Sequence, residues 1–240
     1  MFPRPYLTQD GVLWVRDVDT PKGRMRVLQH QGVYQSASFL DDRKFEAPFA
    51  YLQAFDHVFE LSQVKRVLLL GGGGYSWPKQ VLAHDRDVIL DVVEIEPVFT
   101  KAARRHLFLD EVCKLATKAK MHVFHEDGLA YLRRCEERYS AIVNDAFQGD
   151  QPAGGLLTDE ALALAKEHLA KNGAYFVNVV ADEGTEEFEE ALHCIGRAFV
   201  HTYVIEARDP ELSEVDNFLV VGSDVEQPFT KVLQQRVRVL

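Results

Sequence analysis

Four glycines, Gly71–Gly74, directly follow the apolar run Val67–Leu70, and this junction limits the possible folds more than any other feature of the chain. A continuous apolar run of this kind is typical of a strand buried on both faces of a parallel sheet. A glycine in regular structure costs about 0.5–1 kcal/mol relative to alanine, so four in succession indicate a sharp turn or a close approach to a ligand. The junction therefore predicts a buried strand that ends in a ligand-facing turn.

From residue 64 onward, short apolar runs alternate with segments of helical periodicity. This alternation predicts right-handed βαβ units and a mostly parallel sheet, whose ligands bind at the carboxyl ends of the strands. We expect Ser76 and Thr158 to cap helices and Asn172-Gly173 to end one. The expected strands cover residues 67–70, 88–93, 121–125, 141–143, 174–180, 202–206 and 218–221, and the expected helices cover 76–84, 97–107, 129–135, 158–170 and 185–199.

The first 44 residues consist of short β-forming runs separated by turn signals. We expect a small N-terminal β-domain over residues 1–44 and a ligand-binding domain over residues 45–240. The expected N-terminal strands lie near 12–15, 24–28 and 33–35. Between Phe45 and Leu61, aromatic residues recur at three- and four-residue spacing, which predicts a helix packed on the core.

The charge balance limits the partners. The 240 residues include 27 Lys and Arg against 37 Asp and Glu, a net charge of −10, which argues against a nucleic-acid binder and favours a cationic substrate. The three cysteines and nine histidines show no metal-ligand spacing, so we expect no metal and a reduced, cytoplasmic protein. We expect no signal peptide, and no membrane span, because the apolar runs are far shorter than ~20 residues.

Acidic residues stand where the later strands are expected to end. Glu94 lies 20 positions after Gly74, where a carboxylate can accept hydrogen bonds from both ribose hydroxyls of a nucleotide. This distance suits an S-adenosyl ligand and a nicotinamide dinucleotide equally. Glu96, beside Pro97, is better explained as an acid at a helix N-terminus. Asp127, after the third strand, can accept a hydrogen bond from an adenine amine or cap the next helix.

The glycine run, the acidic segments around residues 94 and 127 and the polar loop Asp145–Leu156 form four motifs. In order and spacing, these motifs resemble the spermidine synthase family, a branch of class I S-adenosylmethionine-dependent transferases. The resemblance implies a Rossmann-like class I methyltransferase fold, with a seven-stranded, mostly parallel sheet, an antiparallel last strand and a small N-terminal antiparallel β-element. It also implies S-adenosylmethionine or its decarboxylated form as co-substrate, no metal, and a homodimer. The motifs are Gly71–Gly74, Val93–Pro97, Glu126–Gly128 and the polar loop Asp145–Leu156, within a resemblance that runs from about Gly23 to Val221.

The resemblance also assigns roles to individual residues. Asp145 matches the first acid of the family's catalytic loop and is the expected catalytic residue. The other expected site residues are Gly71, Gly72, Gly73, Gly74, Glu94, Asp127 and Gly128 for the co-substrate, and Gln35, Tyr75, Gln148 and Asp150 for the acceptor.

Departures from the family pattern concentrate on the amine-binding groups. Gly74 stands where the family has an aspartate that helps hold the amine-bearing tail of the co-substrate. Gln148 stands where the family has its second catalytic acid, and a neutral amide neither balances a dicationic amine nor takes its proton. Asp150 can replace that acid only if the loop bends differently. Tyr75 replaces a family glycine, and we expect it to narrow the acceptor site.

These departures set the order of the candidate functions. Methyl transfer needs mainly proximity and in-line orientation, because the sulfonium already activates the carbon, so we place methyl transfer to an unidentified small acceptor first. Aminopropyl transfer to an amine, as in spermidine synthase, is the alternative. A non-catalytic nucleoside-binding module and a nicotinamide-dependent oxidoreductase stay open as further alternatives.

Overall fold

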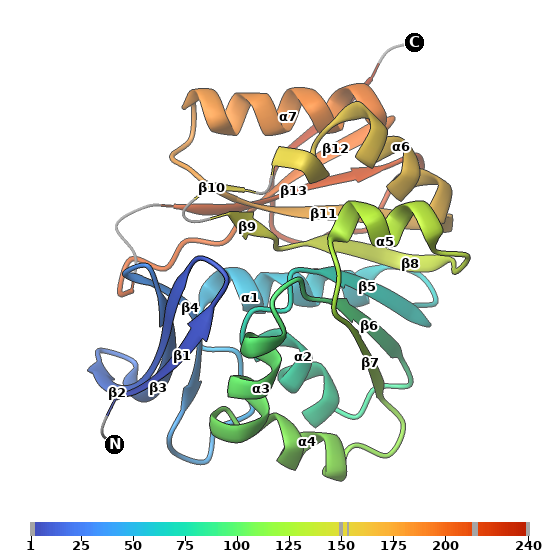
Figure 1. The fold of residues 1–240 in the computed structure, drawn as a ribbon. Helices are drawn as coiled ribbons and strands as arrows, with labels where there is room; N and C mark the ends of the chain where they lie inside the picture. Colours follow the sequence, from blue (N-terminus) through green and yellow to red (C-terminus); the bar gives the residue numbers. More distant parts are fainter. Residues whose placement is uncertain (1–2, 149–150, 153, 213–215, 239–240) are drawn as a thin grey trace.

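The computed structural model describes the chain except for residues 1–2, 149–150, 153, 213–215 and 239–240. Figure 1 shows a small sheet beside a larger sheet that carries helices on both faces. No helix in the described ranges is long and apolar enough to cross a membrane. Within the same ranges, no group of His, Cys, Asp and Glu side chains is arranged to hold a metal ion.

The small sheet is antiparallel, and its strands are neighbours in chain order (dark blue in Figure 1). This arrangement confirms the expected N-terminal β-element. The expected domain boundary after residue 44 falls between Phe39, where the sheet ends, and Ala50, where the first helix begins, and it stays a prediction. The strands are β1 (Arg4–Thr8), β2 (Gly11–Thr20), β3 (Gly23–His30) and β4 (Val33–Phe39).

The larger sheet has eight strands in the order β14-β12-β13-β11-β8-β5-β6-β7. The run from β11 to β7 is parallel, and β13 lies antiparallel between β11 and β12. The class I methyltransferase-like arrangement is therefore confirmed, with β14 as an additional antiparallel edge strand that we did not expect. The strands are β5 (Arg66–Leu70), β6 (Ile89–Val93), β7 (Lys120–Phe124), β8 (Tyr139–Asn144), β11 (Leu169–Val180), β12 (His201–Glu206), β13 (Asn217–Ser223) and β14 (Val232–Val237).

Helices cover both faces of this sheet (Figure 1). Alternate residues of β5 explain how: Val67 and Leu69 belong to one apolar cluster, and Leu68 and Leu70 belong to the other. The continuous apolar run therefore marks a strand buried on both faces, as expected. The helices on one face are α2 (Ser76–Ala83), α3 (Pro97–His106) and α4 (Leu109–Leu115), and those on the other are α5 (Gly128–Arg134), α6 (Asp159–His168) and α7 (Glu186–Ala198).

The segment from Phe45 to Leu61 is less helical than its aromatic spacing predicts. It contains only the short helix α1 (Ala50–Ala54), which tightens into the 3₁₀ turn η1 (Phe55–Glu60). Pro48 disfavours helical geometry in the residue before it, which is consistent with the late start. The aromatic side chains nevertheless pack on the core, with Phe55 fully buried.

The helix ends test the expected caps. Thr158 and Asp127 each accept a hydrogen bond from the first turn of the following helix, which confirms the cap expected at Thr158 and the capping alternative for Asp127. Glu96 lies at the start of α3, as expected of an acid at a helix N-terminus, and its side chain also accepts from Val98. Ser76 is not a cap: its hydroxyl donates to the carbonyl of Ala37 at 2.7 Å, and the N-cap position belongs to Tyr75.

One expected helix end is also wrong. Helix α6 ends at His168, and Asn172-Gly173 lies within β11 instead, where the pairing register shifts. Helix α4 (Leu109–Leu115) was not expected at all.

Candidate active site

The glycine turn brings the ends of β5 and β8 together. Gly71 has a φ of 91°, in the region that favours glycine, and its N–H donates to Val93 of β6 at 2.9 Å. A side chain at Gly71 would overlap the backbone of Asp145. In turn, the N–H of Asp145 donates to Leu70 at 2.8 Å. The first glycine therefore allows Asp145 to lie directly beside the turn.

Glu94 anchors the same turn from β6. One carboxylate oxygen accepts from the N–H groups of Gly72 at 3.0 Å and Gly73 at 2.7 Å, and the other accepts from Glu96 at 2.9 Å. Burial raises the pKa of Glu94, and the three backbone donors act against that rise. A carboxylate has about four lone-pair sites, so Glu94 can accept one further hydrogen bond while it holds the turn.

Gly74 is packed too tightly to carry a side chain. A Cβ at this position would overlap Ser36 of β4 and lie 2.9 Å from the Leu107 side chain. The aspartate that the family pattern places here does not fit unless β4 moves. The packing of the small sheet therefore explains why residue 74 is a glycine. In the sequence alone, Gly74 is visible only as a departure from the family pattern.

Asp127 and Gly128 lie at the neighbouring strand end, after β7. One Asp127 oxygen caps α5 by accepting from Ala130 at 2.9 Å, and the exposed side chain keeps its second oxygen accessible. A Cβ on Gly128 would lie 3.3 Å from Leu156 and 3.6 Å from Leu70, in tight to ordinary contact. Ile95 is 61% exposed at this edge. Sequence reasoning missed Ile95, although a lone apolar residue between two acids is a usable signal.

Asp145 is held by a relay of amides. The Asn178 side chain donates to Asp145 at 2.9 Å, and the Asn217 side chain donates to Asn178 at 3.0 Å. Burial raises the pKa of Asp145 to about 7, the charge of Glu94 adds to the rise, and the Asn178 hydrogen bond opposes it. Sequence reasoning missed both asparagines. The signal for Asn178 is a single amide within the apolar run of β11.

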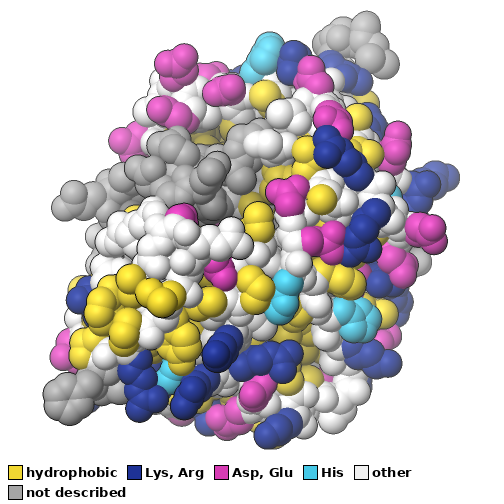
Figure 2. All heavy atoms as spheres, in the orientation of Figure 1, with side chains coloured by type: hydrophobic (Ala, Val, Ile, Leu, Met, Phe, Trp, Pro, Cys, Tyr) yellow, Lys and Arg dark blue, Asp and Glu magenta, His cyan; other side chains and the backbone are white. Residues whose placement is uncertain are grey.

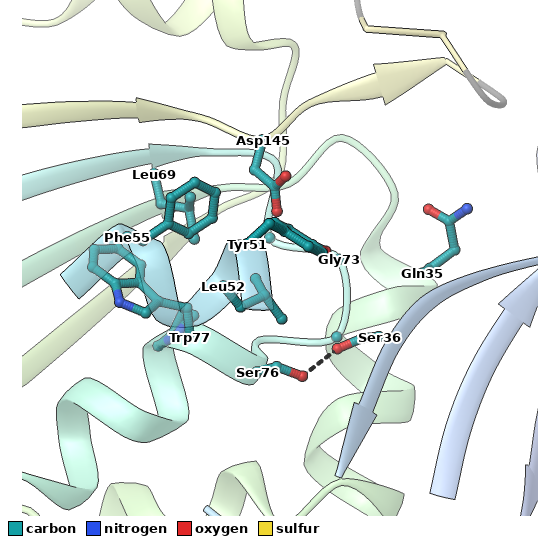
Figure 3. A pocket seen from close by; sticks show the side chains of 13 residues that line it. Gln35, Ser36, Tyr51, Leu52, Phe55, Leu69, Gly73, Ser76, Trp77 and Asp145 are labelled. Carbon is teal, nitrogen blue, oxygen red and sulfur yellow. Dashed lines mark hydrogen bonds between the residues drawn. The ribbon is translucent and has the colours of Figure 1, made fainter. Parts of the chain in front are cut away.

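A small cavity lies between Asp145 and the glycine turn (Figure 3). Its volume is about 10 Å³, enough for about one water molecule. Figure 3 shows Asp145 directed toward Tyr51 and Gly73, with Phe55 and Trp77 on the apolar side. Burial raises the pKa of the Tyr51 phenol well above its ordinary value, and the charge of Asp145 adds to this shift. Sequence reasoning also missed Tyr51.

The expected acceptor residues have separate locations. Gln35 lines the cavity from β4. Tyr75 is fully buried outside the cavity lining, with its hydroxyl 2.6 Å from Thr100 Oγ1 of α3, so the geometry does not support a narrowing of the acceptor site. The backbone of Gln148 belongs to β9 (Phe147–Gln148), which pairs with β10 (Gln151–Pro152). Asp150 lies outside the described residues.

Comparison with known proteins decides the family. A family model described as the spermine/spermidine synthase domain matches residues 48–213, more than half of the chain. The chain belongs to the spermine/spermidine synthase family. This membership confirms the resemblance of the four motifs. The roles of the individual site residues, the homodimer and the cytoplasmic location stay predictions.

Individual relatives agree with this family. A polyamine aminopropyltransferase from Lachnospira eligens is 28% identical over 145 residues, which cover 59% of this chain and 49% of the relative. The chain spans about half or less of the length of the first curated relatives it matches.

Two solved structures share the fold. A spermidine synthase in complex with the transition-state analogue AdoDATO superimposes with a TM-score of 0.71 at 20% identity, over 92% of this chain and 74% of that one. Human methyltransferase-like protein 13 in complex with SAH gives a TM-score of 0.59 at 19% identity, over 75% of this chain and 85% of that one. At these identities the structural likeness concerns the fold alone.

Proposed function

We propose that this chain transfers an aminopropyl group from decarboxylated S-adenosylmethionine to an amine. The observation that carries the proposal is the Asp145 carboxyl group, which lines a cavity against Gly72 and Gly73 and has a pKa of about 7. A base with a pKa near neutrality is suited to removing a proton from an attacking amine. Membership of the spermine/spermidine synthase family supports the same reaction.

Asp145 acts on the acceptor. The acceptor ammonium must lose one proton before its nitrogen has a free electron pair that can bond to the aminopropyl carbon. The C–S bond of the sulfonium breaks, sulfur keeps the electron pair as a neutral thioether, and the proton passes to Asp145. Asn178 keeps the carboxylate oriented through its 2.9 Å hydrogen bond. The negative charge of Asp145 also attracts the ammonium form of the amine before it is deprotonated.

The co-substrate fits the edge formed by Glu94 and Asp127. Glu94 retains acceptor capacity for a ribose hydroxyl while it holds the turn, and Asp127 retains one free oxygen for the adenine amine. Ile95, the residue after Glu94, is 61% exposed and offers an apolar surface for the adenine ring. The described residues at this edge are therefore those that a nucleoside requires.

Methyl transfer, which the sequence pattern placed first, gains no support from the comparisons, and the aminopropyl alternative is the one they favour. The absence of an acid at position 74 was one reason for preferring methyl transfer. The close packing of Gly74 against Ser36 gives that absence a structural cause that does not depend on the co-substrate. Family membership does not identify the acceptor amine of this chain, so the acceptor is part of the proposal.

The test is a product analysis. Purified protein is incubated with decarboxylated S-adenosylmethionine and putrescine, and in parallel with S-adenosylmethionine and the same amine, and products are identified by mass spectrometry. We expect spermidine and methylthioadenosine in the first reaction only, and a strong loss in Asp145→Asn.

Each other outcome favours a different function. S-adenosylhomocysteine in the second reaction would favour methyl transfer. Calorimetric binding of methylthioadenosine that is lost in Glu94→Ala, without turnover of any amine in a panel, would favour a non-catalytic nucleoside-binding module.

A further inference from the structure

A groove of about 520 Å³ runs along the outer side of α3, separate from the Asp145 cavity. Lys101, Arg104 and Arg105 line it from α3, and Val123 and His125 line it from β7 and the residue that follows. Asp110 of α4 is the acid in its lining. The volume lies within the range of roughly 300–1,000 Å³ that is usual for small-molecule sites.

The groove has the opposite charge to the protein as a whole. Three permanent cations face one acid, an excess of two positive charges, whereas the whole chain has a net charge of −10. Figure 2 shows dark blue side chains gathered on the lower front of the molecule, over the position of α3 in Figure 1. The net negative charge of the whole chain does not account for this cluster of cations, so the groove itself needs an explanation.

The cations in the groove are largely uncompensated. Arg104 lies 3.4 Å from Asp110, but both side chains are about half exposed, so this ion pair is weak. Across the described parts of the chain, no acidic side chain pairs with Lys101 or Arg105. Positions i, i+3 and i+4 of a helix share one face, so the three side chains can converge on one ligand.

His125 gives the groove a fixed polar wall. Its Nε2 lies 2.9 Å from the Thr100 hydroxyl, and that oxygen lies 2.6 Å from the Tyr75 hydroxyl. Tyr75 and Thr100 are buried, so the imidazole is anchored from inside the protein. No described residue bonds to the imidazole Nδ1. The groove therefore combines flexible cations with one rigidly placed imidazole.

We propose that this groove binds a small, multiply charged anion of the diphosphate type. Guanidinium groups present a planar fork of donors that matches phosphate oxygens, and the lysine adds a point charge. An extended nucleic acid fits less well. Outside the groove, the chain carries even more net negative charge than the chain as a whole, and it would repel a long polyanion. None of the three cations lines the Asp145 cavity, so the groove is separate from that cavity.

Calorimetric titration with pyrophosphate at low ionic strength tests the proposal. We expect saturable binding to the full chain, and about tenfold weaker binding to the Lys101→Ser/Arg105→Ser double variant, because each exposed contact contributes modestly. The matched control is Lys118→Ser/Lys171→Ser, which removes the same charge at two exposed positions outside the groove. The control is expected to keep the wild-type affinity.

Further titrations distinguish the proposed ligand from the alternatives. Equal affinity in the groove variant and the control, or no binding by the wild-type protein, overturns the proposal. Tighter binding of a single-stranded oligonucleotide than of pyrophosphate, lost in the same groove variant, overturns it in favour of a nucleic acid. Inorganic phosphate is expected to bind more weakly than pyrophosphate. Circular dichroism and thermal unfolding confirm that each variant is folded.

Discussion

The two halves of the candidate site are held in place by different kinds of contact. Glu94 fixes the glycine turn through backbone N–H groups, all of them close to β5 and β6 in the chain. Asp145 depends instead on side chains from distant segments: Asn178 bonds to it from β11, and Tyr51 faces it from α1. The proposed co-substrate half is thus local, and the proposed acceptor half is assembled by the tertiary fold.

The difference predicts how each half responds to mutation. The backbone donors persist whatever side chains surround them, so the turn is vulnerable at their acceptor, Glu94, and at positions where only glycine fits. The acceptor half rests on single side chains, so one substitution there removes a chemical group without disturbing the fold. The following tests examine this contrast, beginning with the largest expected effect on activity.

Asp145→Asn is expected to reduce the rate of aminopropyl transfer by about 100- to 10,000-fold, because it removes the proposed general base. Single-turnover kinetics measure this effect. Methylthioadenosine affinity is expected to stay near the wild-type value, since the glycine turn is untouched. Asp159→Asn, an exposed acid in the first turn of α6, is the control and is expected to leave the rate unchanged. Full activity in Asp145→Asn would refute the assignment.

Gly71→Ala is expected to reduce the free energy of unfolding by about 3 kcal/mol, because the new methyl group meets the Asp145 backbone at a φ of 91°. Chemical denaturation measures the change. Gly155→Ala is the control, since a Cβ there has nothing within 4 Å. Similar stabilities of the two variants would show that the turn is more adaptable than its contacts indicate.

Glu94→Gln is expected to weaken methylthioadenosine binding by about 10- to 100-fold, because an amide accepts fewer hydrogen bonds from the turn than a carboxylate. Isothermal titration calorimetry measures the affinity. Glu96→Gln, at the same strand end but bonded to Val98 and Gln9, is the matched control and is expected to change affinity little. An equal loss in both variants would remove the special role of Glu94.

The pH dependence reports on Asp145 directly. With a pKa of about 7, the rate is expected to rise with pH through neutrality as the carboxyl loses its proton. Asn178→Ala removes a hydrogen bond that lowers this pKa, so the rising limb is expected to move up by about one pH unit. A profile that is unchanged in this variant would contradict the positioning role of Asn178.

The raised pKa of Asp145 also makes the free energy of unfolding depend on pH. The pKa of Asp145 is raised from 3.8 in the unfolded chain to about 7 in the fold, so the folded state binds the proton more tightly. The stabilisation of the folded state by this protonated carboxyl group is therefore full below about pH 3.8 and is lost as pH rises through 7. At pH 8, Asp145→Asn is expected to be more stable than the wild type by up to about 4 kcal/mol, with a smaller difference at pH 4. Denaturation at both pH values measures the difference.

Tyr75→Phe is expected to produce the smallest effect, a loss of about 1 kcal/mol of stability, because it removes only the hydroxyl bonded to Thr100. Acceptor affinity is expected to remain unchanged, since Tyr75 does not line the cavity. A change in amine preference in this variant would restore the expectation that Tyr75 shapes the acceptor site.

Local signals in the sequence were the most reliable guide. The caps at Asp127 and Thr158 were predictable because a short polar side chain and the helix that follows it are neighbours in the chain. The cap expected at Ser76 was wrong because its hydroxyl bonds to Ala37, 39 positions away, where β4 crosses the helix start. A non-local partner of this kind leaves no trace in the local pattern.

The same distinction runs through the candidate site. The strand, the glycine turn and Glu94 follow from residues that are close in the chain, so the sequence by itself determined the parallel sheet and the family, and it placed the candidate ligand-binding edge. Only the tertiary structure showed that Asn178 and Tyr51 converge on Asp145, and that Ser36 excludes a side chain at Gly74. The physical reason is that hydrophobic periodicity reports burial, whereas contacts between distant polar side chains are chosen only when the strands, the helices and the two sheets come together in the tertiary fold.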